Sequence, residues 1–272
     1  MPLGYEIARL PAGAIVEAVG PTSFQVLMPA VSQDAAVSAV LNPAEMITIY
    51  NLNTAKRSSF GVALLDTNTT KNTAVYNGME AGVQARLPNR VIVSGSWTTE
   101  HLAQNSCDTN DNPNGTTTAN LFGTGALVAV GGRFCDQTQF SIPWRHEFKL
   151  LGNVPLPYGV GFAGAIQAYP GLERTITWTP AATLFPGGRT NSEVIVLTRP
   201  GQLYYPRYTQ ADINFKKTFK RGARTFTGQF DLFNVLNSSG ILTQNNAVGA
   251  SLGQPLTILQ GRLPRIVFQM QW

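Results

Sequence analysis

Charged residues are scarce in this 272-residue chain, at 13% of the total against a usual share of about 25%. Only two cysteines and two histidines are present and no CxxC spacing occurs, so a zinc site is not expected. No run of about 18 apolar residues occurs either, which excludes a helical membrane span on length grounds. The Gly, Asn, Thr and aromatic residues that are plentiful instead favour strands and polar loops.

The beginning of the chain, Met1 to Glu6, lacks the basic and apolar segments of a signal peptide. Since a secreted or outer-membrane protein needs such a segment, we expect a shortened chain or a part of a longer gene product. The net charge is +5 at pH 7, but the Lys and Arg residues at 216–224 are interrupted by aromatic residues and glycine. Nucleic-acid binding is therefore not expected.

The clearest pattern is an alternation of apolar and polar residues with period two. At the C-terminus, Ile266, Phe268 and Met270 lie on one face, with Arg265 and Gln269 on the other. The same alternation occurs near residues 79–86, 91–98, 144–150, 160–167, 210–216 and 226–233. Seven strands are therefore predicted, and segments near 46–52 and 59–66 are candidates for one or two more.

The connections between these segments alternate between short and long. Short links lie at 87–90, 153–157 and 220–223, and long links run roughly over 101–139, 169–206 and 237–262. In an up-and-down antiparallel sheet, such alternation collects tight turns at one end and long loops at the other. This asymmetry is typical of outer-membrane barrels, which have short periplasmic turns and long extracellular loops.

The predicted fold is all-β: an antiparallel up-and-down transmembrane β-barrel segment of about seven to nine strands. Its apolar side chains would face lipid, and its polar ones a lumen. The alternative is a soluble β-sandwich, which explains the alternation but neither the loop asymmetry nor the aromatic C-terminus. We assign residues 46–272 to the C-terminal part of the barrel. Residues 1–45 lack firm alternation and are interpreted as a loop of the parent barrel or an unstructured leader.

Several segments resemble TonB-dependent receptors, above all the large Oar-like ones that carry a carboxypeptidase-regulatory-like domain. The last strands of these receptors are similar to Tyr204–Asp212, Phe215–Phe219 and Phe230–Asn237. Other pieces that fit the likeness are Tyr76–Glu80, Ile142–Lys149 and Ile258–Arg262. The resemblance covers the chain from about residue 46 to its end and lies in the order and spacing of the motifs.

The resemblance implies a bacterial outer-membrane location and a role as the wall of a nutrient-uptake channel. It also implies two partners, outer-membrane lipid and the barrel-assembly machinery, for which Phe268, Met270 and Trp272 match the family's recognition signal. The family's barrels have about 22 strands, an N-terminal plug and a TonB box. We therefore expect a fragment that lacks the plug and the remaining strands. The alternative function is a secreted or surface β-sandwich, an adhesin-like module whose long loops bind a ligand.

Charged side chains of both signs fall on the predicted polar face, where they are expected to line a lumen and to pair across strands. They are Glu80, Arg86, Arg145, Glu147, Lys149, Asp212, Lys216 and Asp231. Cys107 and Cys135 fall in one long loop. A disulfide between them is favoured over two free thiols, because an extracellular loop lies in an oxidising compartment.

Other polar residues are candidates for metal binding or catalysis. Oxygen-bearing side chains at 108–115 lack the bidentate Glu of a calcium loop, so a solvated loop is favoured over a metal site. His146 alternates with Phe148 on the apolar face, and a structural role is favoured for it. No Ser, His and carboxylate are grouped by the pattern. The chain is accordingly predicted not to be an enzyme and to hold no cofactor.

Overall fold

The structure, a computed structural model, describes residues 4–7, 16–18, 35–41, 50–52, 64–67, 70–107, 117–119, 128–130, 134–179 and 194–272. Within these residues the chain is mostly antiparallel β-structure, with a single short α-helix, α1 (Ala35–Val40). The all-β prediction is therefore confirmed. No helix in the described ranges is long and apolar enough to cross a membrane.

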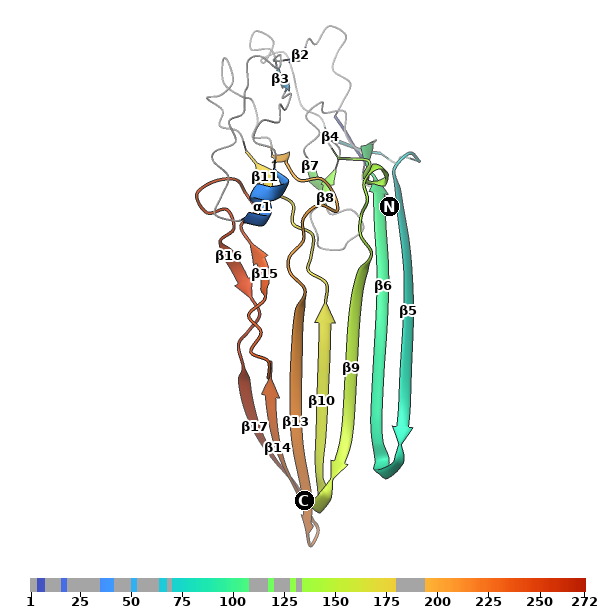
Figure 1. The fold of residues 1–272 in the computed structure, drawn as a ribbon, viewed down its shortest axis with the longest axis vertical. Coiled ribbons are helices and arrows are strands. Elements are labelled where there is room, and N and C mark those ends of the chain that lie inside the picture. The colour runs from blue at the N-terminus through green and yellow to red at the C-terminus, as the bar shows by residue number, and fades with distance from the viewer. Residues whose placement is uncertain are drawn as a thin grey trace.

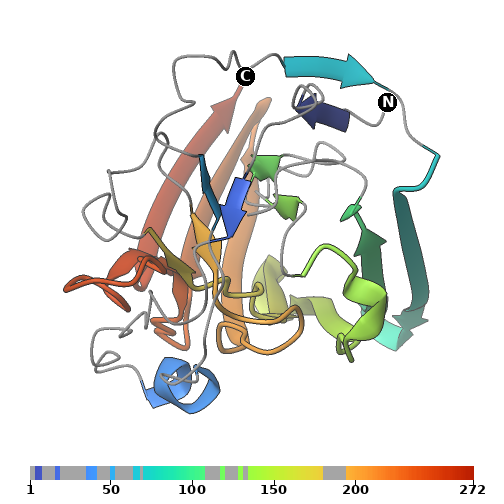
Figure 2. The same ribbon diagram turned by 90° about the horizontal axis from the view of Figure 1, so that it is seen from above.

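The dominant element is one seven-stranded antiparallel sheet with up-and-down topology (Figure 1). Its strands are, in order, β5 (Thr73–Leu87), β6 (Val91–Asn105), β9 (Arg145–Leu156), β10 (Val160–Tyr169), β13 (Tyr208–Arg221), β14 (Arg224–Phe233) and β17 (Leu263–Gln271). All seven predicted strands are present. Seen from above, the sheet bends into an arc (Figure 2). The strands β5 and β17 form its two edges and do not pair with each other.

The two ends of the sheet differ as the sequence predicts. Three tight turns lie at one end: the 3-10 turns η2 (Pro88–Arg90) and η6 (Pro157–Gly159), and residues 222–223 between β13 and β14. The long connections 106–144, 170–207 and 234–262 lie at the other end (Figure 1). We call these the turn end and the loop end.

The tight turns share one backbone solution. Both 3-10 turns begin with proline and continue in the left-handed region, with φ of 61° at Asn89 and 63° at Tyr158. The third turn has Gly222 at φ 62°. Glycine tolerates this conformation without a steric penalty, and asparagine tolerates it better than most residues do. Tyr158 and Arg90, with φ of 63° and 60°, adopt it as well, although they are neither glycine nor asparagine.

Two predicted boundaries are wrong. The second turn lies at 157–159 rather than 153–157, because β9 continues through Pro155 to Leu156. Pro155 lies past the last paired residues of β6 and β9, Ile92 and Asn153, where its missing N–H breaks no ladder on that side. The first long loop begins at residue 106 rather than 101, because β6 extends to Asn105.

One face of the sheet is apolar and uncovered. Exposed fractions reach 69% at Val83, 66% at Ile266 and 84% at Phe268. Other exposed side chains on this face are Val75, Met79, Leu87, Phe148, Leu150, Leu156, Ile166, Phe215, Phe219, Phe230 and Met270. In a β-sandwich these side chains would pack against a second sheet. No second layer covers them in the described part of the chain.

Buried apolar side chains instead gather in the loops. The core consists of Val37, Leu41, Ile176, Trp178, Ile195, Leu197 and Leu203. It joins α1 to the short pair β11 (Thr177–Trp178) and β12 (Ile195–Val196). Another pair, β15 (Ile241–Gln244) with β16 (Pro255–Ile258), lies in the last loop. Part of the loop end therefore has a small hydrophobic core of its own.

Short strands also occur outside the main sheet. The candidate segments near 46–52 and 59–66 contain β3 (Tyr50–Leu52) and β4 (Leu64–Thr67). They pair with β2 (Val16–Ala18) and β1 (Gly4–Ile7) rather than with the seven-stranded sheet. A third pair, β7 (Thr117–Ala119) with β8 (Val128–Val130), lies in the first long loop. The division of the chain at residue 45 stays a prediction.

Candidate functional site on the polar face of the sheet

The second face of the sheet is polar, and it carries all the charged residues predicted for it. Directly opposed residues in neighbouring strands share a face, so the register can be followed from strand to strand. Glu80 and Glu147 both oppose Thr98, and Asn214 opposes Asp231. The eight predicted charged residues on this face are Glu80, Arg86, Arg145, Glu147, Lys149, Asp212, Lys216 and Asp231. That this face lines a lumen stays a prediction.

Opposite charges pair near the loop end of this face. Arg145 Nη1 lies 3.4 Å from Glu100 Oε1 on the neighbouring strand, and the Tyr76 hydroxyl donates to Glu100 Oε2 at 3.3 Å. Lys149 pairs with Glu147 on its own strand. These side chains are about one-third exposed, so each pair contributes at most about 1 kcal/mol. Their main effect is to fix which charges face the loops.

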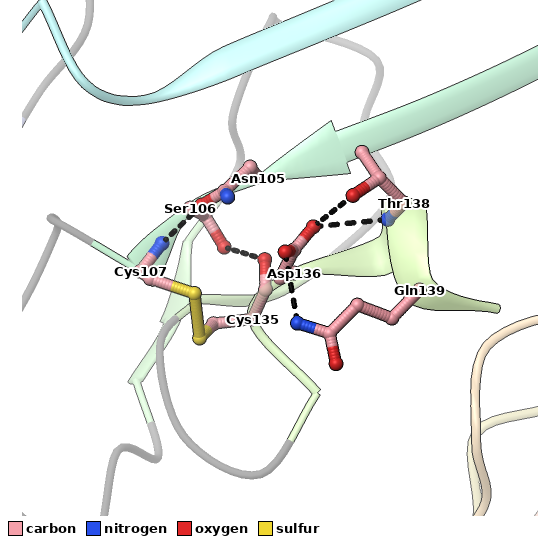
Figure 3. Close-up of a disulfide and its surroundings, with 7 residues drawn as sticks. All are labelled: Asn105, Ser106, Cys107, Cys135, Asp136, Thr138 and Gln139. Carbon is pink, nitrogen blue, oxygen red and sulfur yellow. Dashed lines mark hydrogen bonds between the residues drawn. A yellow bond between two sulfur atoms is a disulfide. The ribbon is translucent and has the colours of Figure 1, made fainter.

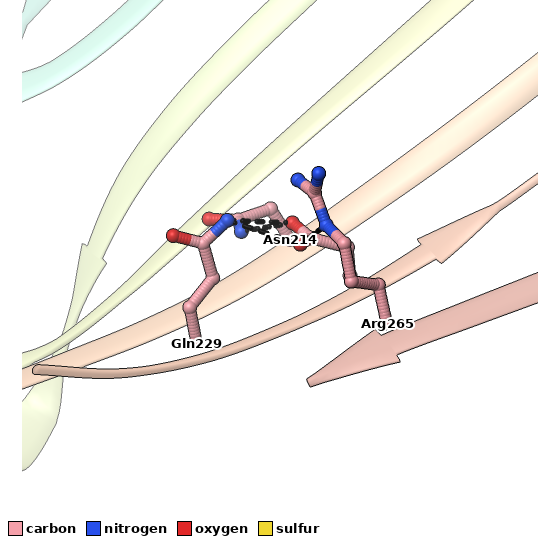
Figure 4. A network of polar contacts seen from close by, with 4 residues as sticks. Asn214, Gln229 and Arg265 are labelled. Carbon is pink, nitrogen blue, oxygen red and sulfur yellow. Dashed lines mark hydrogen bonds and ion pairs between the residues drawn. The ribbon is translucent and has the colours of Figure 1, made fainter. Parts of the chain in front are cut away.

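Asp231 is the centre of a buried polar cluster that links β13, β14 and β17 (Figure 4). Its carboxylate accepts hydrogen bonds from Asn214 Nδ2 at 2.5 Å, Gln229 Nε2 at 2.9 Å and Arg265 Nε at 2.8 Å. Asp231 is only 4% exposed, whereas the side chain of Arg265 is 56% exposed. The cluster therefore satisfies a buried carboxylate with three donors and leaves the Arg265 side chain partly exposed.

A second cluster ties the last long loop to the sheet. The Asp212 carboxylate accepts from the backbone N–H of Asn234 at 2.8 Å. Asn234, 2% exposed and at φ 50°, donates through Nδ2 to the carbonyls of Ser238 and Gln260 at 2.9 and 2.7 Å. Its side-chain oxygen accepts from the N–H of Ser238 at 2.9 Å. One asparagine thus holds both ends of the 234–262 loop beside the wall.

The polar face is hollowed at mid-height. A cavity of about 380 Å³ opens on it, lined by side chains of five strands from β6 to β14. Its polar groups are Ser94, Asn153, Asp212, Asn214 and Asp231. Small residues of β10, Ala163 and Ala165, form its floor. The strand in the middle of the sheet therefore leaves room along the polar face.

A second cavity, of about 350 Å³, lies where the loops meet the polar face. The sheet contributes Thr98, Glu100, Arg145, Glu147, Tyr169 and Tyr208, and the loops contribute residues 170–172, Tyr205 and residues 241–243. We call it the loop-end pocket. Its volume is near the lower limit of small-molecule sites, which span about 300–1,000 Å³.

The loop-end pocket combines aromatic rings with charges of both signs. The rings of Tyr169 and Tyr208 stack with centroids 5.3 Å apart, and Lys149 Nζ lies 5.6 Å from the Tyr169 centroid. The buried Nε of Arg145 has no hydrogen-bond partner among the described residues. Such a pocket offers rings for stacking, the partly exposed guanidinium of Arg145 as a donor, and the carboxylates of Glu100 and Glu147 as acceptors.

Burial raises the pKa values of two residues in the neighbouring loop, Tyr204 and Glu173. Burial raises the pKa of Tyr204 to about 12, with a further contribution from the nearby Glu173 charge. Burial also raises the pKa of Glu173, opposed by the Gly201 N–H, which donates to Glu173 Oε1 at 2.6 Å, and by the charge of Arg145. The Tyr204 hydroxyl therefore keeps its proton to a higher pH than an exposed tyrosine does.

The predicted disulfide is present, and Figure 3 shows its surroundings. Cys107 and Cys135 are bonded and close the base of the first long loop, with a sequence separation of 28. The Ser106 N–H donates to the Cys135 carbonyl at 2.8 Å, and Asp136 accepts from the Thr138 N–H at 3.0 Å. The bond therefore holds the loop at the point where it leaves β6.

Other predicted positions lie as follows. His146 stacks on Trp97 on the apolar face, with ring centroids 5.9 Å apart. Phe268 and Met270 lie on the exposed apolar face of β17, and Trp272, directly after it, is 88% exposed; their role in barrel assembly stays a prediction. The segment at 108–115 lies outside the described residues. Within the described ones, no three His, Cys, Asp or Glu residues are placed to hold a metal ion.

Sequence reasoning missed several residues of this site. Arg265 belongs to the polar face by alternation, but its pairing with Asp231 depends on the register of two strands 34 residues apart. Asn234 shows a local signal, because asparagine directly after a strand often adopts a left-handed conformation. Tyr205, 8% exposed, accepts from the Gln244 N–H at 3.0 Å and so belongs to the loop core.

No protein-family model matches the sequence, and no curated protein is significantly similar to it.

Proposed function

We propose that this chain forms part of the wall of a bacterial outer-membrane β-barrel, belonging to a TonB-dependent receptor that takes up a nutrient. The observation that carries the proposal is the two-faced sheet. Large apolar side chains such as Val83, Phe148 and Phe268 are exposed on one face. The other face holds an internally satisfied carboxylate, Asp231, and cross-strand ion pairs.

The exposed face requires an apolar environment. Soluble proteins rarely expose a contiguous apolar patch larger than a few hundred Å², and larger patches mark membrane or protein contacts. Here the apolar side chains continue across all seven strands, from Val75 on β5 to Met270 on β17. Because backbone groups within the sheet pair with neighbouring strands, such a wall satisfies the hydrogen-bond demand of a lipid environment.

Strand direction sets a condition on closure. Six antiparallel steps separate β5 from β17, so both edge strands run from the loop end to the turn end. With all loops on one side of a membrane, β5 and β17 are unable to pair antiparallel to each other. Antiparallel closure therefore needs an odd number of further strands. Bacterial single-chain barrels have an even strand number, which agrees with seven strands as part of a larger wall.

The loop end supports a role in uptake. Long loops fold over the polar face and leave the loop-end pocket, where Tyr169, Tyr208 and Arg145 line a cavity of about 350 Å³. Substrates of a receptor would arrive from this side. The assignment to TonB-dependent receptors specifically comes from the resemblance of segments such as Phe230–Asn237.

Membrane insertion is tested by fractionation of the cells that make the protein. We expect the chain to sediment with outer-membrane markers and to stay in the pellet after alkaline carbonate washing, until detergent is added. Release by carbonate alone would contradict the proposal, because a peripheral or soluble protein leaves the membrane under that treatment. An integral protein and a peripheral protein of the same membrane serve as controls.

The receptor assignment is tested separately by affinity purification in mild detergent. The chain is expected to bring with it a plug domain and further barrel strands, on the same polypeptide or bound to it. Mass spectrometry of the purified material identifies them. A membrane-inserted assembly that contains neither would overturn the receptor assignment while leaving the barrel wall in place.

A further inference from the structure

Positive charge is concentrated at the turn end of the sheet. Asp231 opposes Asn214 and Arg265, and the same row continues to Arg86 on β5. Between this row and the turns there is no Asp or Glu in residues 87–91, 154–162, 215–230 and 266–272. The basic residues there are Arg90, Lys216, Lys217, Lys220, Arg221 and Arg224, and all are exposed.

Three of these cations lie on the apolar face. The register continues this face through Phe215 opposite Phe230, then Lys217 opposite Gly228, then Phe219 opposite Phe226. The last row of β13 and β14 is Arg221 opposite Arg224. The face therefore passes from apolar side chains, through Lys217 and then a stacked aromatic pair with centroids 5.2 Å apart, to Arg221 and Arg224 at the turn.

Within the described turn end, no Asp or Glu side chain is present to neutralise these cations. Like charges directly opposite each other in neighbouring strands are destabilising. Lys217, Arg221 and Arg224 are all absent from the ion pairs formed among the described residues. Three unpaired cations at the border of an exposed apolar surface match a membrane interface, where long basic side chains extend to the headgroups while their stems cover apolar surface.

We propose that the turn end binds the headgroups of anionic phospholipids through Lys217, Arg221 and Arg224, with Phe219 and Phe226 at the level of the interface. This inference rests on the proposed membrane function and names the lipid contact of the wall. The charge and the order of the rows argue for lipid rather than a soluble anion, because the cations continue the apolar face. Girdles of aromatic residues are typical of the membrane boundaries of β-barrels.

The test measures lipid binding to the full chain refolded in an uncharged detergent. Native mass spectrometry compares phosphatidylglycerol with phosphatidylcholine of the same acyl chains. The triple variant Lys217→Gln/Arg221→Gln/Arg224→Gln removes the charges, and Lys217→Arg/Arg221→Lys/Arg224→Lys keeps them. Arg199→Gln, which removes an exposed charge in a long loop, is the positional control.

The wild type is expected to bind phosphatidylglycerol more tightly than phosphatidylcholine. Each basic residue near an anionic surface contributes about fivefold in affinity, so the neutral triple variant should lose roughly a hundredfold. The charge-keeping variant and Arg199→Gln should retain the preference. Equal binding of both lipids by the wild type, or an undiminished preference in the neutral variant, would overturn the inference.

Two further outcomes are separable. Inorganic phosphate is added at millimolar concentration as a competitor, and displacement of the lipid by phosphate would show a soluble-anion site and refute the lipid assignment. Absence of binding to either phospholipid would count against the proposed membrane function itself. The lipid inference alone fails when both lipids bind but the headgroup makes no difference.

Discussion

Leu150 and Leu151 on β9 provide a direct test of which face meets lipid. The two residues are adjacent in the middle of the sheet, and each is 48% exposed. Leu150 opposes Gly95 and Ile166 on the apolar face, whereas Leu151 opposes Ser94 and Ala165 on the polar face. Arginine at either position makes the same chemical change at the same height in the sheet.

The two substitutions should differ strongly in a bilayer. Arginine on the lipid face near the midplane of a barrel costs about 2–4 kcal/mol, so Leu150→Arg should lower the folded-to-unfolded ratio by roughly 30- to 1,000-fold. Leu151→Arg should stay within about 0.5 kcal/mol, as for exposed positions elsewhere. Asp212 opposes Ala165 in the same row, so a carboxylate lies on the same face as the new guanidinium.

Urea unfolding of the chain in phospholipid vesicles, followed by tryptophan fluorescence, measures this difference. Vesicles of an uncharged lipid keep headgroup attraction out of the comparison. Equal costs at the two positions would refute the assignment of the apolar face to lipid. A milder effect of Leu150→Arg than of Leu151→Arg would assign lipid to the opposite face.

Three further predictions concern the Asp231 cluster, the disulfide and Glu173. Asp231→Asn should lower the free energy of unfolding by about 2 kcal/mol, because three donors lose a buried charged acceptor. Arg265→Gln should lower it by less than about 1 kcal/mol, because the Arg265 side chain is mostly exposed. Equal losses for the two variants would argue against the difference in burial. Cys107→Ser/Cys135→Ser should speed proteolysis within residues 106–144 while the sheet stays folded, since a separation of 28 residues corresponds to about 3.5 kcal/mol of chain entropy. An unchanged cleavage rate would contradict this role of the disulfide. Burial raises the pKa of Glu173 above 4.5, so the folded chain holds this proton more tightly than the unfolded chain does. The stability of the fold should therefore fall as the pH rises from about 4.5 through the raised pKa. Thermal unfolding across pH 4–8 measures this dependence of stability on pH, and Glu173→Gln should flatten it.

Strand number and faces are predictable because alternation is a local signal. Each strand shows its apolar side within about ten residues, so Phe226, Phe230 and Met270 identify their face without any knowledge of neighbours. Strand ends are less visible. Thr99 and His101 occupy apolar-face positions of β6, so the alternation stops although the ladder continues to Asn105.

The contacts of the site depend on register, which no single segment contains. The charge of Asp231 is visible in the sequence, but Asn214, Gln229 and Arg265 converge on it only once β13, β14 and β17 are aligned. The loop core is beyond local patterns as well. Val37 and Ile176, both fully buried, come from segments about 140 residues apart and show no periodicity that would pair them.

The polar residues of the segment Phe230–Asn237 argue for where a ligand is recognised. Asp231 is occupied by three donors, and Asn234 uses its side chain on Ser238 and Gln260. Groups that are satisfied internally have little left to offer a substrate. Recognition should therefore depend on side chains such as Arg145, which lines the loop-end pocket and is about one-third exposed. In this division the sheet supplies shape, and the pocket beneath the loops supplies selectivity.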